Sequence, residues 1–190
     1  KAMLSEAVLG LGRSSTLVHG LCHLTRPDAE GVEATDVNQV MDAALGLLEP
    51  TWGERILVVK EYADLPRISC LPAHICRVFL HILENAAAAI EDRGRVSIHT
   101  RAGGVRNIEI RISDTGTGIA NDVLPEVFEP FFSTRGESLG LGLSVAQGIV
   151  KMHGGTINLR SSAETGTSVI ISLPIVAAAA VSNLPMAGKR

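Results

Sequence analysis

Four short motifs, in a fixed order along the chain, carry side chains and backbone groups that could together bind a phosphorylated ligand. They are Asn85, residues 114–118 (DTGTG), residues 128–135 (FEPFFSTR) and residues 140–143 (GLGL). Taken singly, each pattern is typical of an ordinary turn, a helix start or a packed core. Their order and spacing together favour a single binding site.

The two glycine motifs differ in the chemistry that they offer. Asp114 ends an alternating strand pattern, and because a carboxylate only accepts hydrogen bonds, it favours a ligand with an N–H donor, such as an adenine amino group. Gly116 and Gly118 would let the backbone approach a flat ligand closely. Gly140 and Gly142 open a helical pattern, where unpaired N–H groups and the positive end of the helix dipole suit a phosphate.

Asn85 and its helical neighbours suggest a metal and a second polar group. The amide oxygen of Asn85 is a suitable hard ligand for Mg²⁺ that is held mainly by water and phosphates. His81 lies one helical turn before Asn85, on the same face of the helix. Glu84 is next to Asn85 in the sequence and points to a different face. We keep two interpretations of His81, a polar neighbour of the site and a plain surface histidine. Residues 136–138 are short enough to act as a lid.

The elements that must position these groups follow from periodicity and from residues that start or stop helices. Helical patterns cover residues 1–26, 36–48, 73–92 and 143–152, with Asp36 as a helix N-cap. Strand patterns cover residues 56–59, 96–100, 105–113, 156–161 and 168–173, the last four forming two hairpins. We therefore predict an α+β fold, a two-layer sandwich of a mixed, mainly antiparallel sheet with helices on one face.

Composition excludes several classes of partner. The chain has 190 residues and a net charge of −3, which argues against a generic binder of nucleic acid. Aromatic residues make up 3%, too few for a single-strand stacking platform, and no apolar run is long enough to span a membrane. Three cysteines indicate packed, reduced thiols and a cytoplasmic location. Cys70, His74 and Cys76 lack the spacing of a zinc site.

The four motifs together resemble the N box, G1 box, F box and G2 box of the sensor histidine kinases of two-component systems. These belong to the superfamily that includes gyrase-type and chaperone-type ATPases. The resemblance covers about residues 17–175. It implies that the domain binds Mg²⁺ and ATP and transfers the γ-phosphate to a histidine on its own dimerisation domain. A receiver domain of a response regulator would then accept the phosphoryl group on an aspartate.

The resemblance also implies roles for individual residues. Asn85 would hold Mg²⁺, and Asn85, His81 and Arg135 would act in the transfer step. The remaining candidates would bind the nucleotide. They are Asp114, Gly116, Gly118, Ile119, Phe132, Thr134, Gly140, Leu141, Gly142, Leu143 and Thr167. Thr167 is included because residues 163–174 resemble the closing hairpin of the family.

The domain organisation follows from the same resemblance. Residues 1–27 would be a remnant of the second dimerisation helix, 28–35 a linker, 36–176 the ATP-binding catalytic domain and 177–190 a flexible tail. No histidine of the chain has the His-Glu/Asp-x-x-x-Pro context of the phosphoacceptor. We therefore expect the acceptor on a preceding helix of a longer, homodimeric protein, and the chain to be a fragment of it.

The sequence departs from the family at several places. His81 replaces an asparagine, Ser138 replaces the first glycine of the G2 box, and Arg135 replaces a lysine. In the ATPase branch of the superfamily, a glutamate at the position of His81 polarises the attacking water. The absence of this glutamate favours transfer to a histidine over hydrolysis of ATP. Two alternatives stay open, a docking module that binds ATP without transferring phosphate and a serine kinase of the same superfamily.

Overall fold

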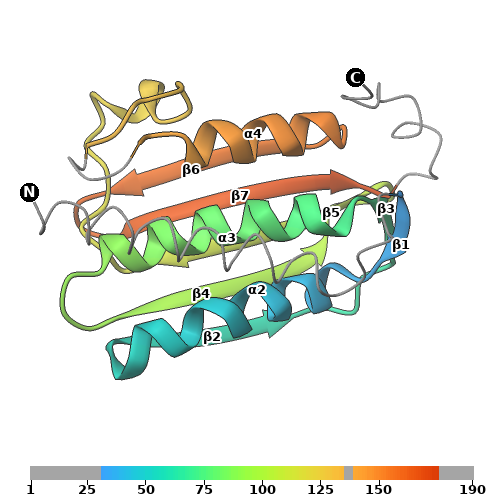
Figure 1. The fold of residues 1–190 in the computed structure, drawn as a ribbon, viewed down its shortest axis with the longest axis horizontal. Coiled ribbons are helices and arrows are strands. Elements are labelled where there is room, and N and C mark those ends of the chain that lie inside the picture. The colour runs from blue at the N-terminus through green and yellow to red at the C-terminus, as the bar shows by residue number, and fades with distance from the viewer. Residues whose placement is uncertain (1–30, 135–138, 176–190) are drawn as a thin grey trace, which may run out of the picture. The chain divides into compact units, whose positions relative to one another are not determined.

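A mixed sheet forms one layer of the molecule. The computed structural model describes residues 31–134 and 139–175, and within them five strands pair in the order β2-β4-β5-β7-β6 (Figure 1). The strands are β2 (Ile56–Tyr62), β4 (Gly94–Ala102), β5 (Asn107–Asp114), β6 (Thr156–Ser162) and β7 (Gly166–Pro174). Only the β2–β4 pair is parallel among these five strands. The predicted mixed, mainly antiparallel sheet is confirmed.

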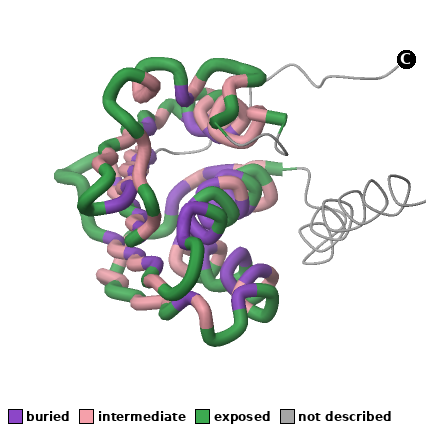
Figure 2. The backbone as a smooth tube through the Cα atoms, turned by 90° about the vertical axis from the view of Figure 1, so that its left-hand side faces the viewer, coloured by how far each residue is buried: buried purple, intermediate pink, exposed green. Residues whose placement is uncertain are grey.

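Three helices of the described part form the second layer. They are α2 (Val37–Trp52), α3 (Pro72–Ala89) and α4 (Gly142–Met152). They cover one face of the sheet, with α3 between the other two, and buried residues line the space between the layers (Figure 2). Ile98, Ile110 and Ile171, at alternating positions of three strands, are fully buried, because successive strand residues point to opposite faces. The α+β sandwich is confirmed.

Local sequence signals set the ends of the helices. Oδ1 of Asp36 accepts hydrogen bonds from the backbone N–H groups of Asn38 and Gln39, which caps α2. Pro72 is the first residue of α3, where its missing N–H costs nothing. Gly154, with a φ of 72°, ends α4 in the left-handed conformation that glycine adopts without strain. The described residues also form two short 3₁₀ helices, η1 (Gly53–Arg55) and η2 (Leu124–Glu126).

Part of the expected linker is a strand. Residues 28–35 are predicted from the sequence as a linker, but Glu33–Thr35 form β1, which pairs antiparallel with β3 (Ile68–Cys70). Three residues give no periodic pattern, and their conformation depends on a partner more than thirty residues away. The strand predicted at 56–59 also extends to Tyr62, because it pairs in register with β4 up to Thr100.

Several predictions lie outside the described residues. They concern the dimerisation remnant at 1–27, residues 28–30 of the linker, Arg135, the lid at 136–138 and the tail at 177–190. Within residues 31–134 and 139–175, no helix is long and apolar enough to cross a membrane.

Candidate functional site

Asp114 ends β5 and fixes what we call the first glycine turn, residues 114–119. It is 6% exposed. Its Oδ1 atom accepts hydrogen bonds from the backbone N–H of Gly116 at 2.8 Å and of Thr167 at 3.3 Å. One carboxylate thus joins the end of β5, the turn that follows it and the start of β7.

The first glycine turn packs directly against α3 and β6. The backbone N–H of Thr117 donates to the carbonyl oxygen of Ala89 at 3.0 Å. A Cβ atom on Gly116 would lie 2.5 Å from that same oxygen. Gly118 has a φ of 69°, and a Cβ there would lie 2.2 Å from the carbonyl oxygen of Ser162. No side chain fits at either position.

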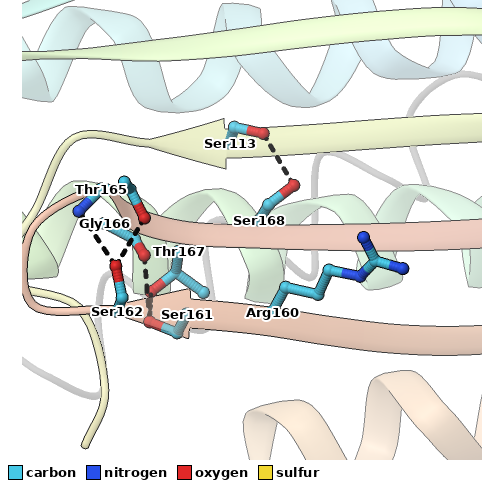
Figure 3. A pocket seen from close by; sticks show the side chains of 8 residues that line it. All are labelled: Ser113, Arg160, Ser161, Ser162, Thr165, Gly166, Thr167 and Ser168. Atoms are coloured by element: carbon cyan, nitrogen blue, oxygen red, sulfur yellow. Dashed lines mark hydrogen bonds between the residues drawn. The ribbon is translucent and has the colours of Figure 1, made fainter.

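A serine that the sequence patterns do not single out completes this group. Oγ of Ser161 accepts from the backbone N–H of Ile119 at 2.8 Å and lies 2.9 Å from Oγ1 of Thr167. Ser161 and Thr167 line a pocket whose walls are mainly hydroxyl groups (Figure 3). Ser161 continues the inward-facing positions of Ile157 and Leu159 on β6. A polar residue that ends an apolar alternation is the signal that could have found it.

His81 and Asn85 lie on successive turns of α3. Asn85 is exposed, whereas only 25% of the His81 side chain is exposed and its Nε2 atom is buried without a hydrogen-bond partner among the described residues. Nδ1 of His81 is 3.8 Å from a carboxylate oxygen of Glu84, and a Cβ on Gly142 would lie 3.5 Å from Nδ1. The structure thus places His81 near the start of α4.

The second glycine turn, residues 139–143, is joined to the phenylalanine motif. The backbone N–H of Phe131 donates to the carbonyl oxygen of Gly140 at 3.0 Å, and the φ angles of these residues are 67° and 65°. A Cβ on Gly140 would lie 2.4 Å from the carbonyl oxygen of Phe132. The N-cap residue Leu141 forms no side-chain cap, so it leaves the amides of the first turn of α4 for another acceptor.

The other predicted residues of this region have varied exposure. Phe132, Leu141 and Leu143 are half-buried, and Thr134 is exposed.

One face of α3 links the two glycine turns. His81, Asn85 and Ala89 follow one another along α3 at intervals of four residues. His81 lies near Gly142 of the second glycine turn, and the carbonyl oxygen of Ala89 accepts from Thr117 of the first. Residues four apart share a helix face. With a rise of 1.5 Å per residue, Asn85 stands about 6 Å along the axis from each of the other two. The predicted metal ligand therefore lies between the predicted adenine end and the predicted phosphate end.

The histidine and cysteine residues outside this region have structural partners. Cys70 and Cys76 are buried, and neither forms a disulfide within the described residues. Nδ1 of His153 lies 2.8 Å from the carbonyl oxygen of Ile149, and Nε2 accepts from the backbone N–H of Leu71 at 3.2 Å. His153 thus contacts the end of its own helix and also ties α4 to the start of α3. No group of three or more His, Cys, Asp or Glu residues that could hold a metal is found among residues 31–134 and 139–175.

Comparisons with known proteins point to one family. A family model described as "Histidine kinase-, DNA gyrase B-, and HSP90-like ATPase" matches residues 70–177. The sensor histidine kinase ZraS of Escherichia coli strain K12 is 33% identical over 165 residues, 86% of this chain and 35% of ZraS. Sporulation kinase E of Bacillus subtilis strain 168 is 30% identical over 167 residues, 87% of this chain and 23% of that kinase.

Solved structures share the fold. The mycobacterial sensor histidine kinase MprB is 27% identical with a TM-score of 0.69, over 75% of this chain and 97% of the MprB chain. The catalytic domain of the histidine kinase ThkA, 23% identical over 76% of this chain and 95% of its own, superposes with a TM-score of 0.69.

These findings define the class as an ATPase catalytic domain of the histidine kinase type. The chain belongs to the family of histidine kinase-, DNA gyrase B- and HSP90-like ATPases, which confirms the resemblance inferred from the four motifs. The chain spans about a third of the length of the first curated relatives that it matches.

Proposed function

We propose that this domain binds ATP with Mg²⁺ between its two glycine turns and transfers the γ-phosphoryl group to a histidine of a dimerisation domain. The observation that carries the proposal is the spacing on α3, where Asn85 stands between His81, which lies near Gly142, and Ala89, which accepts from the backbone N–H of Thr117. A span of about 12 Å from His81 to Ala89, eight residues at 1.5 Å each, suits an extended nucleotide.

Each end of the site would bind a different part of the substrate. Asp114 would accept from the adenine amino group, since a carboxylate has two oxygens and about four lone-pair sites and can serve the two backbone amides as well. The close packing of Gly116 on Ala89 and of Gly118 on Ser162 would hold the backbone of this turn in place beside the base. The start of α4 would present backbone N–H groups to the phosphates.

The donor set also fits a magnesium ion. Asn85 supplies an amide oxygen at an exposed position of α3, and Mg²⁺ usually takes one or two protein oxygens while keeping water and phosphate ligands. The ion would neutralise phosphate charge during transfer. His81 would lie beside the phosphates, and Arg135, which is outside the described residues, would add positive charge there.

In the transfer step, a nitrogen of the acceptor histidine forms a bond to the γ-phosphorus and the bond to the bridging oxygen of ADP breaks. The protein mainly positions the reactants for such a step. The phosphohistidine would then pass its phosphoryl group to an aspartate of a response-regulator receiver domain.

Substitution of Asp114 by asparagine tests nucleotide binding. An asparagine keeps one oxygen that can accept from Gly116 and Thr167, so the fold should persist, but its amide nitrogen cannot accept from adenine. We expect calorimetry to detect no binding of a non-hydrolysable ATP analogue by D114N, with unchanged affinity in the control D64N, outside the site. Equal affinity in D114N and the wild type would remove the adenine-reading role.

Incubation with labelled ATP, Mg²⁺ and an intact dimerisation hairpin tests transfer. Acid-labile label on the hairpin histidine is the expected result. Binding of ATP without any labelled hairpin would indicate the alternative, a regulatory docking module.

A His81→Glu variant tests why transfer is preferred to hydrolysis. A glutamate at this position would place a base next to the phosphate end, so ATP hydrolysis should become faster than in the wild type. If H81E hydrolyses ATP no faster, the comparison with the ATPase branch does not apply here.

The remaining parts of the proposal concern the longer protein. Residues 1–27 would belong to the second dimerisation helix of a homodimer, joined through residues 28–35 to the catalytic domain. The relatives that support this are named sensor histidine kinases. A cytoplasmic location would fit the need for ATP.

A further inference from the structure

We infer that Arg55 is a positioning residue for the first glycine turn and, through it, for nucleotide binding. The inference rests on the proposed function. Arg55 ends η1, just before β2, and belongs to none of the four motifs. Its Nη1 atom donates to the carbonyl oxygen of Ala87 at 3.2 Å and also to that of Ile90.

These carbonyl groups belong to the end of α3, which lacks a basic residue of its own. The last four carbonyl groups of a helix have no partner within the helix. The C-cap residue Ile90 is in the extended conformation, with a φ of −89° and a ψ of 111°, and the last turn contains no basic residue. Arg55 therefore supplies, from another part of the chain, the donor and the positive charge that stabilise a helix C-terminus.

The same helix end holds the first glycine turn. Ala89, between the two residues that Arg55 contacts, accepts from the backbone N–H of Thr117 at 3.0 Å. Gly116 packs so closely on Ala89 that a Cβ would lie 2.5 Å from its carbonyl oxygen. A rotation of this last turn of α3 would therefore move the backbone that follows Asp114.

The opposite side of the turn provides an internal reference. The backbone N–H of Ile119 donates to Ser161 on β6 and not to α3. Loss of Arg55 should therefore loosen the Thr117 end of the turn and leave the Ile119 end unchanged.

The test compares Arg55→Met and Arg55→Lys with Arg101→Met in the full chain. Arg101 forms an exposed ion pair with Glu109 on β5. R101M therefore removes an arginine–glutamate ion pair that does not involve α3. Binding of a non-hydrolysable ATP analogue with Mg²⁺ is measured by calorimetry, unfolding by urea, and amide hydrogen exchange at Thr117 and Ile119 by NMR.

We expect the dissociation constant to rise roughly tenfold in R55M, about the effect of one hydrogen bond to a charged group. Exchange at Thr117 should become faster and exchange at Ile119 should not change. R55K, which keeps a charge and one donor, should restore part of the affinity, and R101M should behave as the wild type.

A lower stability of R55M with unchanged affinity and unchanged Thr117 exchange would overturn the inference, since Arg55 would then only support the fold. If R55M does not fold, unchanged affinity in R55K together with unchanged Thr117 exchange has the same meaning. A wild-type chain that binds no nucleotide would instead overturn the proposed function.

Discussion

The two glycine turns contact α3 in different ways. In the first turn, backbone meets backbone, because Thr117 donates to the carbonyl oxygen of Ala89 and Gly116 has no room for a Cβ there. In the second turn, the approach to α3 is looser, since a Cβ on Gly142 would lie 3.5 Å from Nδ1 of His81, an ordinary van der Waals distance. The first turn is hydrogen-bonded to the backbone of α3, whereas the group of α3 nearest to Gly142 in the second turn is the side chain of His81.

The second turn is tightly packed toward the phenylalanine motif. Gly140 accepts from the backbone N–H of Phe131, and a Cβ on Gly140 would meet Phe132 at 2.4 Å. We therefore expect the second turn and the phenylalanine motif to adjust together when a ligand binds, while the first turn keeps its position. The variants below test this difference.

The largest effect is expected for Gly118→Ala. Alanine at a φ of 69° is strained, and its Cβ would lie 2.2 Å from the backbone oxygen of Ser162. We expect a loss of about 3 kcal/mol or more in the free energy of unfolding, together with a loss of nucleotide binding. Urea unfolding and calorimetry measure the two effects.

Gly148→Ala is the matched control for this variant. Gly148 lies inside α4, and apart from the backbone of its own helix and its chain neighbours, no atom of the described residues lies within 4 Å of where a Cβ would stand. Alanine should therefore raise the free energy of unfolding by about 0.5–1 kcal/mol. A stable, nucleotide-binding G118A would mean that the first turn is not fixed by the fold.

Gly140→Ala should lower the free energy of unfolding by less than Gly118→Ala. The φ of 65° and the contact with Phe132 make alanine unfavourable by about 1–3 kcal/mol. Because the clash is with the phenylalanine motif, amide exchange should increase at Phe131 and stay unchanged at Thr117. Gly142→Ala is the control in the same turn, and its free energy of unfolding should match the wild type. Faster exchange at both Phe131 and Thr117 in G140A would show that the two turns are coupled.

Several helix ends could be predicted because their signals are local. Asp36, Pro72 and Gly154 stand at the helix ends that their backbone chemistry indicates. The motif residues 114–118 could likewise be read from spacing alone, since a strand end followed by glycines is a local pattern.

The features that could not be predicted depend on contacts between residues far apart in the sequence. Arg55 contacts Ile90, which is 35 residues away, and Ser161 contacts Ile119, which is 42 residues away. No periodicity relates such pairs. The same holds for β1, whose three residues become a strand only by pairing with β3. Loops and single side chains that join distant elements therefore required the structure.

Ser161→Ala should weaken the first turn on the side away from α3. The variant removes the acceptor of the Ile119 amide and the partner of the Thr167 hydroxyl, worth about 1–2 kcal/mol in the free energy of unfolding. Amide exchange should become faster at Ile119 and not at Thr117. Ser162→Ala, where the hydroxyl bonds the exposed Thr165, is the control. Equal exchange at Ile119 in both variants would contradict this role of Ser161.

The smallest effect concerns the first turn of α3, at the end of the helix away from the first glycine turn, and it depends on pH. Burial, then His153 and Arg77, lower the pKa of His74 below the 6.5 of an ordinary histidine. The unfolded chain therefore binds this proton at a higher pH than the folded one, and stability falls as the pH drops through 6.5.

A His74→Gln variant should show a weaker pH dependence of the free energy of unfolding between about pH 5 and about pH 7, measured by urea unfolding. Its nucleotide affinity at neutral pH should equal that of the wild type, because His74 lies seven residues before His81 on α3, away from both glycine turns. The buried His153 ring, 6.2 Å from the His74 ring, stays in place in this variant. Identical slopes in H74Q and the wild type would assign the pH dependence to other groups. A changed nucleotide affinity would show that the start of α3 influences the binding site at its other end. The whole helix, and not only the second glycine turn, would then adjust to the ligand.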